Sequence, residues 1–194
     1  MTNRDQQRDE QRKRILEIAL EEFNRHGFNG TSTRRITEIA GVSSGLLFHY
    51  FPSKVSLYEE LVRIAFRYID VDLEALTIDP LTFFHNQAEF VLSLLRENPR
   101  SATMFTFMAY AEQHPGVSDI VDHFFVEHDL VKRSVPIIEA GQRDGSLRQG
   151  NPEALGVAFW SALQGLAAEV AARGDRALPE SAWIVDILTE RNPK

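Results

Sequence analysis

Hydrophobic residues recur at helical spacing through almost the whole chain, and no segment shows the alternation typical of a β-strand. Ile15, Ala19 and Phe23, for example, lie four residues apart and predict a helix over residues 9–26. Prolines and glycines divide the rest into amphipathic segments. The pattern predicts an all-α protein of about nine helices, over residues 9–26, 33–40, 44–50, 53–76, 80–97, 99–113, 117–144 (kinked at Pro136), 152–173 and 180–191.

Residues 31–54, TSTRRITEIAGVSSGLLFHYFPSK, contain two of these segments in a compact arrangement. Thr33 is expected to cap the first helix, Gly41 to end it in a left-handed conformation, and Ser43 to cap the second. Two short helices joined by a turn that contains glycine form a helix-turn-helix, whose second helix enters the DNA major groove. A purely structural helical hairpin has the same spacing, so the pattern alone leaves both interpretations open.

The apolar positions of this pair predict its packing. Ile36, Ile39 and Ala40 fall on one side of the first helix, and Leu47 and Phe51 can turn inward from the second. We therefore expect Leu47 and Phe51 to be core residues.

The same stretch resembles the DNA-binding motif of the TetR family of transcriptional regulators. Ser44 departs from the family pattern where a basic residue is frequent, Phe48 where tyrosine is common, and Thr37 where alanine is frequent. The residues that carry the resemblance are Thr33, Ile36, Ala40-Gly41-Val42-Ser43, Gly45, Leu47-Phe48-His49-Tyr50-Phe51 and Ser53-Lys54.

The resemblance implies a two-domain, TetR-like architecture. A three-helix DNA-binding domain would occupy residues 1–52, and a helical effector-binding and dimerisation domain residues 53–194. The function it implies is that of a dimeric regulator, a repressor that binds a near-palindromic operator and is released by a small effector.

Within the motif, phosphates are expected at helix beginnings and bases along the second helix. Lys54 lies in the first turn of a helix, where the dipole disfavours a cation unless a phosphate is shared. Leu46 and Phe48 can pack on thymine methyl groups, although ordinary core packing would explain them too. His49 and Tyr50, near the end of the second helix, can donate to phosphates. The expected DNA-binding set is Thr33, Arg34, Ser43, Ser44, Gly45, Leu46, Phe48, His49, Tyr50 and Lys54.

Base readout by this helix is expected to be modest. The segment Ser44–Tyr50 contains no Arg, Asn or Gln, the side chains that make bidentate contacts to base edges. Apolar contacts and DNA shape would therefore share the task of selecting a sequence.

Charge would argue against DNA binding only if it were evenly spread. The net charge is −7, but residues 1–63 contain ten basic and nine acidic residues, whereas residues 64–194 contain eleven and nineteen. The chain has no Cys, its N-terminus is polar, and its apolar stretches look too short for a membrane span. We therefore expect a cytoplasmic protein.

Small residues crowd the segment 154–172, and close approach of helices requires such residues. They predict a dimer interface in the last two helices, with a well-packed intramolecular hairpin as the alternative. The predicted interface residues are Ala158, Ser161, Ala162, Gly165, Ala168 and Trp183.

Aromatic and methionine side chains concentrate in the middle of the chain and predict a pocket for an apolar or aromatic effector. For any one of these residues, ordinary core packing is the simpler explanation. The predicted pocket residues are Phe83, Phe84, Phe90, Met104, Phe105, Met108, Phe124, Phe125 and His128.

Asp119, His123 and Glu127 share one helix face at metal-ligand spacing, but a solvated face is the simpler interpretation. We predict no metal, no cofactor and no enzymatic activity, because no catalytic constellation is found. Two alternatives remain: a TetR-like adaptor that acts through protein partners without binding DNA, and a small helical enzyme that uses His123 or His128.

Overall fold

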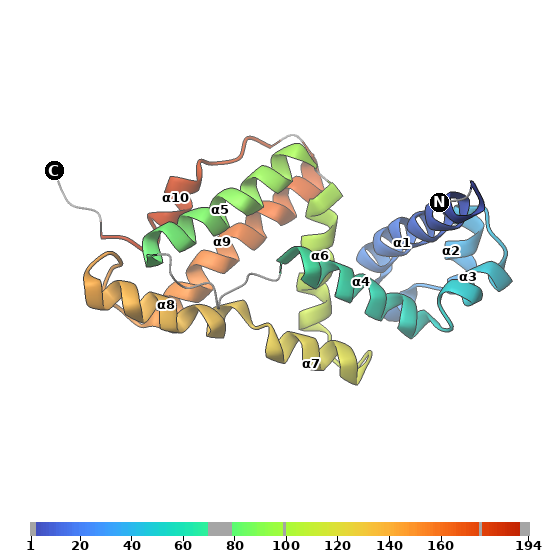
Figure 1. Ribbon diagram of the computed structural model, residues 1–194, viewed down its shortest axis with the longest axis horizontal. Coiled ribbons are helices and arrows are strands. Elements are labelled where there is room, and N and C mark those ends of the chain that lie inside the picture. Colours follow the sequence, from blue (N-terminus) through green and yellow to red (C-terminus); the bar gives the residue numbers. More distant parts are fainter. Residues whose placement is uncertain (1–2, 70–78, 99, 175, 191–194) are drawn as a thin grey trace. The chain divides into compact units, whose positions relative to one another are not determined.

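The computed structural model describes residues 3–69, 79–98, 100–174 and 176–190. Within these ranges the chain forms ten helices and no strand, which confirms the predicted all-α class (Figure 1). The helices are α1 (Asn3–Gly30), α2 (Thr33–Ala40), α3 (Ser44–Tyr50), α4 (Lys54–Ile69), α5 (Pro80–Glu97), α6 (Arg100–Gln113), α7 (Asp119–Glu127), α8 (Leu130–Asp144), α9 (Pro152–Arg173) and α10 (Ser181–Val185).

Three of the predicted helices differ from the observed ones. Helix α1 begins at Asn3, earlier than predicted, and it continues through a kink at Gly27, where φ is 67°. The predicted helix over 117–144 is two helices, because Asp129 interrupts it and caps α8 by accepting a hydrogen bond from the Lys132 amide at 3.0 Å. Helix α10 is shorter than predicted, and the predicted end of the fourth helix near residue 76 lies outside the described residues.

Contacts divide the chain into two compact units. The first unit comprises Met1–Ile69 and Phe107–Phe125, and the second comprises Asp70–Thr106 and Val126–Lys194. This division by packing is not the predicted functional boundary after residue 52, because α4 packs against α1 inside the first unit.

The core of the first unit is aromatic. The Tyr58 ring packs edge-on against Phe23 at 5.1 Å, against Phe28 at 5.2 Å and against Phe107 at 5.0 Å. The Tyr58 side chain is fully buried and burial raises the pKa of its hydroxyl, so the residue behaves as a hydrophobic anchor. This cluster joins α1, α4 and the Phe107 end of α6 inside the first unit.

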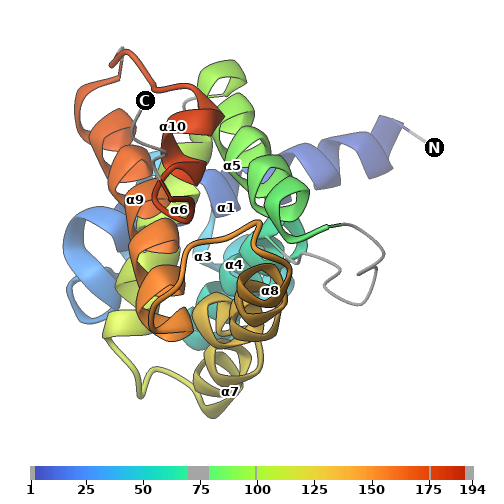
Figure 2. The ribbon, with the colours of Figure 1, turned by 90° about the vertical axis from the view of Figure 1, so that its left-hand side faces the viewer.

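The second unit is built around a separate hydrophobic core. Helices α5, α8, α9 and α10 enclose it, as the end-on view in Figure 2 shows. Phe84 packs against Phe159 with ring centroids 4.9 Å apart, and both side chains are fully buried. Gly156 lets α9 approach α8 closely, since a Cβ there would lie 3.0 Å from the Ser134 hydroxyl.

Helix α9 is unusual because it is apolar and yet mostly uncovered. By length and composition alone it could cross a membrane, which was not expected from the sequence, and 28% of its most apolar window is buried. A single helix of this kind is weak support for a membrane segment, since a helix that packs in a soluble protein passes the same test.

Candidate nucleic-acid interface

The two helices of the predicted motif are formed by local capping. Ser32, not Thr33, is the N-cap of α2, and its hydroxyl accepts a hydrogen bond from the Arg35 amide at 3.2 Å. Gly41 ends α2 in the left-handed conformation (φ 67°), as predicted. Ser43 caps α3 as predicted, accepting from the Leu46 amide at 3.1 Å.

Burial separates the core face of this pair from its outer face. Leu47 and Phe51 are buried as expected, and Ile36 and Ala40 are buried too. Ile39 shares a side with Ile36 and Ala40 in the sequence pattern, but its side chain is 47% exposed, because the buried side of α2 is occupied by Ile36, Thr37 and Ala40.

The outer face of α3 is open to solvent. Ser44, Gly45 and His49 are exposed and the Phe48 side chain is 45% exposed, so ordinary core packing does not explain Phe48. A Cβ at Gly45 would meet nothing closer than the Ser43 hydroxyl at 3.9 Å, which leaves the backbone of α3 accessible. A partner molecule could therefore come close to the backbone of this helix.

The angle of α2 to α1 is held by a buried carboxylate. Glu22 is 2% exposed, and its Oε2 accepts a hydrogen bond from Nε of Arg35 at 2.5 Å. The Thr31 hydroxyl donates to the backbone carbonyls of Glu22 at 3.0 Å and Gly27 at 2.8 Å. A buried charge of this kind is tolerated only when it is paired, so the pair restricts the arrangement of the two helices.

Lys54 lies where the sequence predicted a phosphate contact, but its ammonium is occupied within the chain. Nζ donates to the carbonyls of Phe28 at 2.8 Å and Thr31 at 2.9 Å, and it lies 4.2 Å from the centre of the Phe28 ring. Partial burial lowers the pKa of this ammonium. The conflict between a cation and the start of α4 is thus resolved by two carbonyls, without a phosphate.

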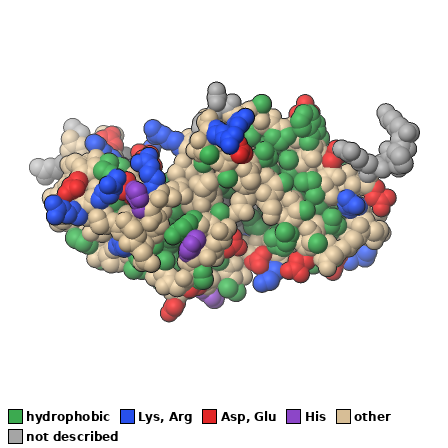
Figure 3. Space-filling model, turned by 180° about the vertical axis from the view of Figure 1, so that it is seen from behind, with side chains coloured by type: hydrophobic (Ala, Val, Ile, Leu, Met, Phe, Trp, Pro, Cys, Tyr) green, Lys and Arg blue, Asp and Glu red, His purple; other side chains and the backbone are tan. Residues whose placement is uncertain are grey.

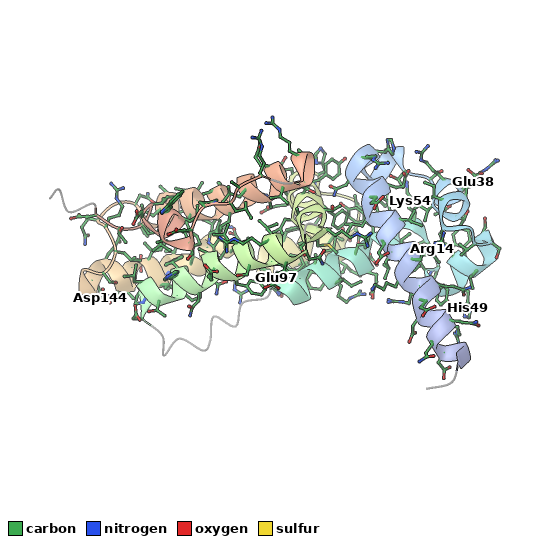
Figure 4. The ribbon with its side chains drawn as sticks, turned by 90° about the horizontal axis from the view of Figure 1, so that it is seen from above. Arg14, Glu38, His49, Lys54, Glu97 and Asp144 are labelled. Carbon is green, nitrogen blue, oxygen red and sulfur yellow. The ribbon has the colours of Figure 1, made fainter. Side chains whose placement is uncertain are left out.

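The Tyr50 hydroxyl also has its hydrogen-bond acceptor within the chain. It donates a hydrogen bond to the carbonyl of Arg8 in α1 at 3.1 Å, whereas the sequence predicted donation to a phosphate. Figure 4 shows His49 beside the N-terminal part of α1 and Lys54 at the opposite end of that helix. Nothing in the local sequence pattern indicated either contact, since the partners lie far apart along the chain.

The remaining predicted DNA contacts stay on the surface. Arg34 is exposed and its Nε donates to the Glu38 carboxylate at 2.8 Å, an i,i+4 pair that raises the pKa of the guanidinium. An exposed pair of this kind contributes little to stability, so Arg34 can exchange Glu38 for a phosphate at small cost. Thr33 occupies the first position of α2 and is half-buried.

The predicted pocket residues are divided between the two units. Phe83 and Phe84 are core residues of the second unit, which is the simpler explanation raised from the sequence, whereas Phe90 is 49% exposed. The first unit holds Met108, Phe124 and Phe125, and the last two pack on Phe66 with centroids 5.3 Å away. The second unit also contains three half-buried residues of the predicted pocket, Met104, Phe105 and His128.

A hollow of about 560 Å³ occurs on the second unit. It is open to solvent and none of its lining residues belongs to the predicted pocket. The lining residues are Arg148, Trp183, Asp186, Ile187, Thr189 and Glu190.

The predicted dimer residues fall into two groups. Ala158, Ser161, Gly165 and Ala168 are exposed on α9, and Trp183 of α10 is 62% exposed. Ala162, by contrast, packs against the core of its own unit. In the space-filling view from behind, hydrophobic side chains gather over the part of the surface that the second unit provides (Figure 3).

Metal chemistry finds no support among the residues that the structure describes. Within them, no group of three or more His, Asp or Glu side chains is placed to hold a metal ion, and this includes Asp119, His123 and Glu127.

Comparison with known proteins places the chain among bacterial regulators. Residues 15–61 match the family profile described as bacterial regulatory proteins, tetR family. The transcriptional repressor KstR2 of Mycolicibacterium smegmatis is 30% identical over 146 residues, which cover 71% of this chain and 67% of that protein. The regulator RutR of Escherichia coli K12 is 29% identical over 156 residues, 79% of this chain and 72% of that protein.

Solved structures agree on the fold. A TetR-family regulator from Agrobacterium tumefaciens superposes with a TM-score of 0.70 at 21% identity, over 94% of this chain and all of that one. The regulator PfmR from Thermus thermophilus gives a TM-score of 0.69 at 22% identity, over 90% and 96% of the two chains. The chain belongs to the TetR family and is a helix-turn-helix transcriptional regulator, not an enzyme.

Proposed function

We propose that the chain is a cytoplasmic, homodimeric repressor that binds a near-palindromic operator through α3 and is released by a small apolar or aromatic effector. The observation that carries the DNA-binding part is the open outer face of α3. Phe48 is 45% exposed there and Gly45 leaves the backbone accessible, although the same helix buries Leu47 in the core. Gly45 and Phe48 are three residues apart and so share one face of α3, where a partner could contact both.

The DNA face consists of Thr33 and Arg34 at the start of α2 and of the outer residues of α3. Phe48 and Leu46 would contact thymine methyl groups, and Gly45 would allow the backbone to enter the groove. One helix reads too few base pairs for selectivity, so two copies one helical turn apart along the DNA are needed.

A stripe of small residues on α9 supports the dimer. Its members alternate four and three residues apart, the 3.5-residue repeat of helices that pack side by side, and all of them are exposed. Val157 (48% exposed) and Trp183 (62% exposed) add large apolar side chains to the same unit. The stripe consists of Ala154, Ala158, Ser161, Gly165, Ala168 and Ala172.

The effector part rests on composition and on family membership. The half-buried Met104 and His128 remain candidates to line an apolar site, since Phe83 and Phe84 pack in the core and Phe105 packs against it. A site of this composition favours an apolar or aromatic molecule over a sugar or a nucleotide.

The experiment that tests DNA binding compares the chain with its Gly45→Ala variant. Fluorescence anisotropy against the DNA upstream of the chain's own gene should show binding that weakens steeply as salt rises. The added methyl group should keep or raise the thermal midpoint, since alanine favours helix over glycine by up to about 1 kcal/mol. DNA affinity should nevertheless fall about tenfold, because the methyl group separates α3 from the groove, a loss of about 1.4 kcal/mol.

The controls decide between a repressor and an adaptor. Absence of wild-type binding at micromolar protein, in low salt and without effector, would exclude the repressor and favour an adaptor that acts through protein partners. Unchanged affinity of Gly45→Ala, with a folded protein, would show that α3 does not approach the groove in the way proposed.

A further inference from the structure

The first three turns of α1 lie outside the hydrophobic core. Residues 5–11 are exposed, and the first buried residue of the helix is Ile15. Residues 3–14 therefore form a helical extension about 18 Å long, at 1.5 Å per residue. Burial of apolar surface does not explain why this extension is helical and in place.

Side chains at the end of α3 hold the extension. The Tyr50 hydroxyl donates to the Arg8 carbonyl at 3.1 Å, and Nη2 of Arg8 lies 3.2 Å from Nε2 of His49. One turn further along, the Arg12 guanidinium lies over the Phe51 ring, 5.3 Å from its centre. Three consecutive residues at the end of α3 thus contact two arginines that are one helical turn apart.

The two arginines differ in their charge balance. Arg12 donates to the Glu60 carboxylate at 2.5 Å, so its charge is compensated. Arg8 faces only the imidazole of His49, and among the described residues no carboxylate pairs with it. A guanidinium carries five donors, and most of those of Arg8 remain available to another acceptor.

We propose that Arg8 is a DNA-phosphate contact and that Tyr50 is the residue that positions it. The inference rests on the proposed function, because it takes the outer face of α3 as the face that meets DNA. Tyr50 and Lys54, the donors expected at phosphates, give their hydrogens to backbone carbonyls instead. Arg8, by contrast, places a positive charge next to His49. Its guanidinium can bind a phosphate through two parallel hydrogen bonds.

The test compares Arg8→Gln with Arg14→Gln. Both replace an exposed arginine of α1 by a neutral side chain of similar length, and the positions are about 120° apart around the helix. Binding is measured by anisotropy over a range of salt concentrations, with the upstream duplex and with a mixed-sequence duplex. Arg8→Gln should lower the salt slope by about 0.9 and weaken both duplexes about eightfold at 0.1 M salt, whereas Arg14→Gln should change neither.

Further variants separate the possible outcomes. Arg8→Lys should restore the salt slope, because the charge is what matters. Tyr50→Phe should weaken binding in the wild-type background but much less in Arg8→Gln, because Tyr50 acts through Arg8. Additive losses would overturn the positioning role of Tyr50.

Failure of this inference can be told from failure of the proposed function. If the wild-type chain binds DNA and Arg8→Gln keeps its salt slope, Arg8 is not a phosphate contact, although the regulator remains. If the loss is confined to the upstream duplex, Arg8 reads bases, and the phosphate assignment is wrong. If the wild-type chain binds neither duplex, the proposed function fails first.

Discussion

At the scale of single residues, the hydrogen bonds of Lys54 to backbone carbonyls replace the phosphate contact that the sequence predicted. Its ammonium links the carbonyl of Phe28, near the end of α1, to that of Thr31 in the following loop. Positive charge near the end of a helix is favourable, and hydrogen bonds to a charged group are stronger than neutral ones. Lys54 therefore holds α1, the loop and the start of α4 together from inside the first unit.

Replacing Lys54 tests whether it acts by stabilising the fold or by contacting DNA. Lys54→Met keeps most of the aliphatic stem and removes the donors, so the free energy of unfolding should fall by about 1–3 kcal/mol in urea titrations. The salt slope of DNA binding should stay unchanged, because no phosphate contact is lost.

The matched control is Lys13→Met, since Lys13 is an exposed lysine of α1 whose ammonium lies 3.9 Å from Glu17. It should change stability by less than about 0.5 kcal/mol. If Lys54→Met instead lowers the salt slope of DNA binding by about one, Lys54 contacts a phosphate, as the sequence predicted.

At the scale of helices, α9 carries two different faces. One face buries Phe159, Leu163, Ala167 and Val170 against its own unit. The other presents the small-residue stripe, which nothing in the described chain covers. An amphipathic helix would place polar residues there, so the stripe indicates a second helix rather than solvent.

The stripe can be tested with two equivalent substitutions. Ala158→Arg places a long cation on the stripe, while Ala171→Arg places it about 140° away on the exposed surface of the same helix. Both variants should fold. Analytical ultracentrifugation should show a monomer only for Ala158→Arg, because a buried unpaired charge is costly in an interface. Two dimeric variants, or two monomeric ones, would show that the stripe is not the contact between copies.

At the scale of the whole molecule, a repressor must couple effector and operator. If an effector binds the state that is unsuited to DNA, it lowers DNA affinity by the same factor by which DNA lowers effector affinity. A thermal-shift screen of apolar compounds would identify a ligand. Its dissociation constant, measured with and without saturating operator, should then change by about 5–150-fold, the same factor as the reciprocal measurement. A ligand that raises the thermal midpoint but leaves DNA affinity unchanged would not be the effector.

The acidic and basic residues are also distributed unevenly over the whole molecule. The acidic excess belongs to residues 64–194, which bear eleven basic and nineteen acidic side chains, and the helix-turn-helix lies in the nearly balanced N-terminal third. An overall net charge of −7 is thus compatible with DNA binding, because phosphates respond to the local surface.

Some of the candidate site could be predicted from the sequence because its causes are local. The left-handed Gly41 and the Ser43 cap depend on residues within one helical turn, so the pattern specifies them. The N-cap of α2 was misplaced by one residue, since Ser32 and Thr33 are both good caps. Ile39 is exposed although the pattern puts it on one side with Ile36 and Ala40, because a short helix has room to bury only one narrow side.

The sequence by itself determined the all-α class, the helix-turn-helix and the family, since hydrophobic spacing, capping and the residues of the motif are all local. Only the tertiary structure decided which acceptors Tyr50 and Lys54 use within the chain. Their acceptors are backbone carbonyls 42, 26 and 23 residues away, and every residue carries a carbonyl, so no side-chain pattern can specify which one is used. The folded chain selects these acceptors, and among the residues that the structure describes it leaves Arg8 beside α3 without a carboxylate partner.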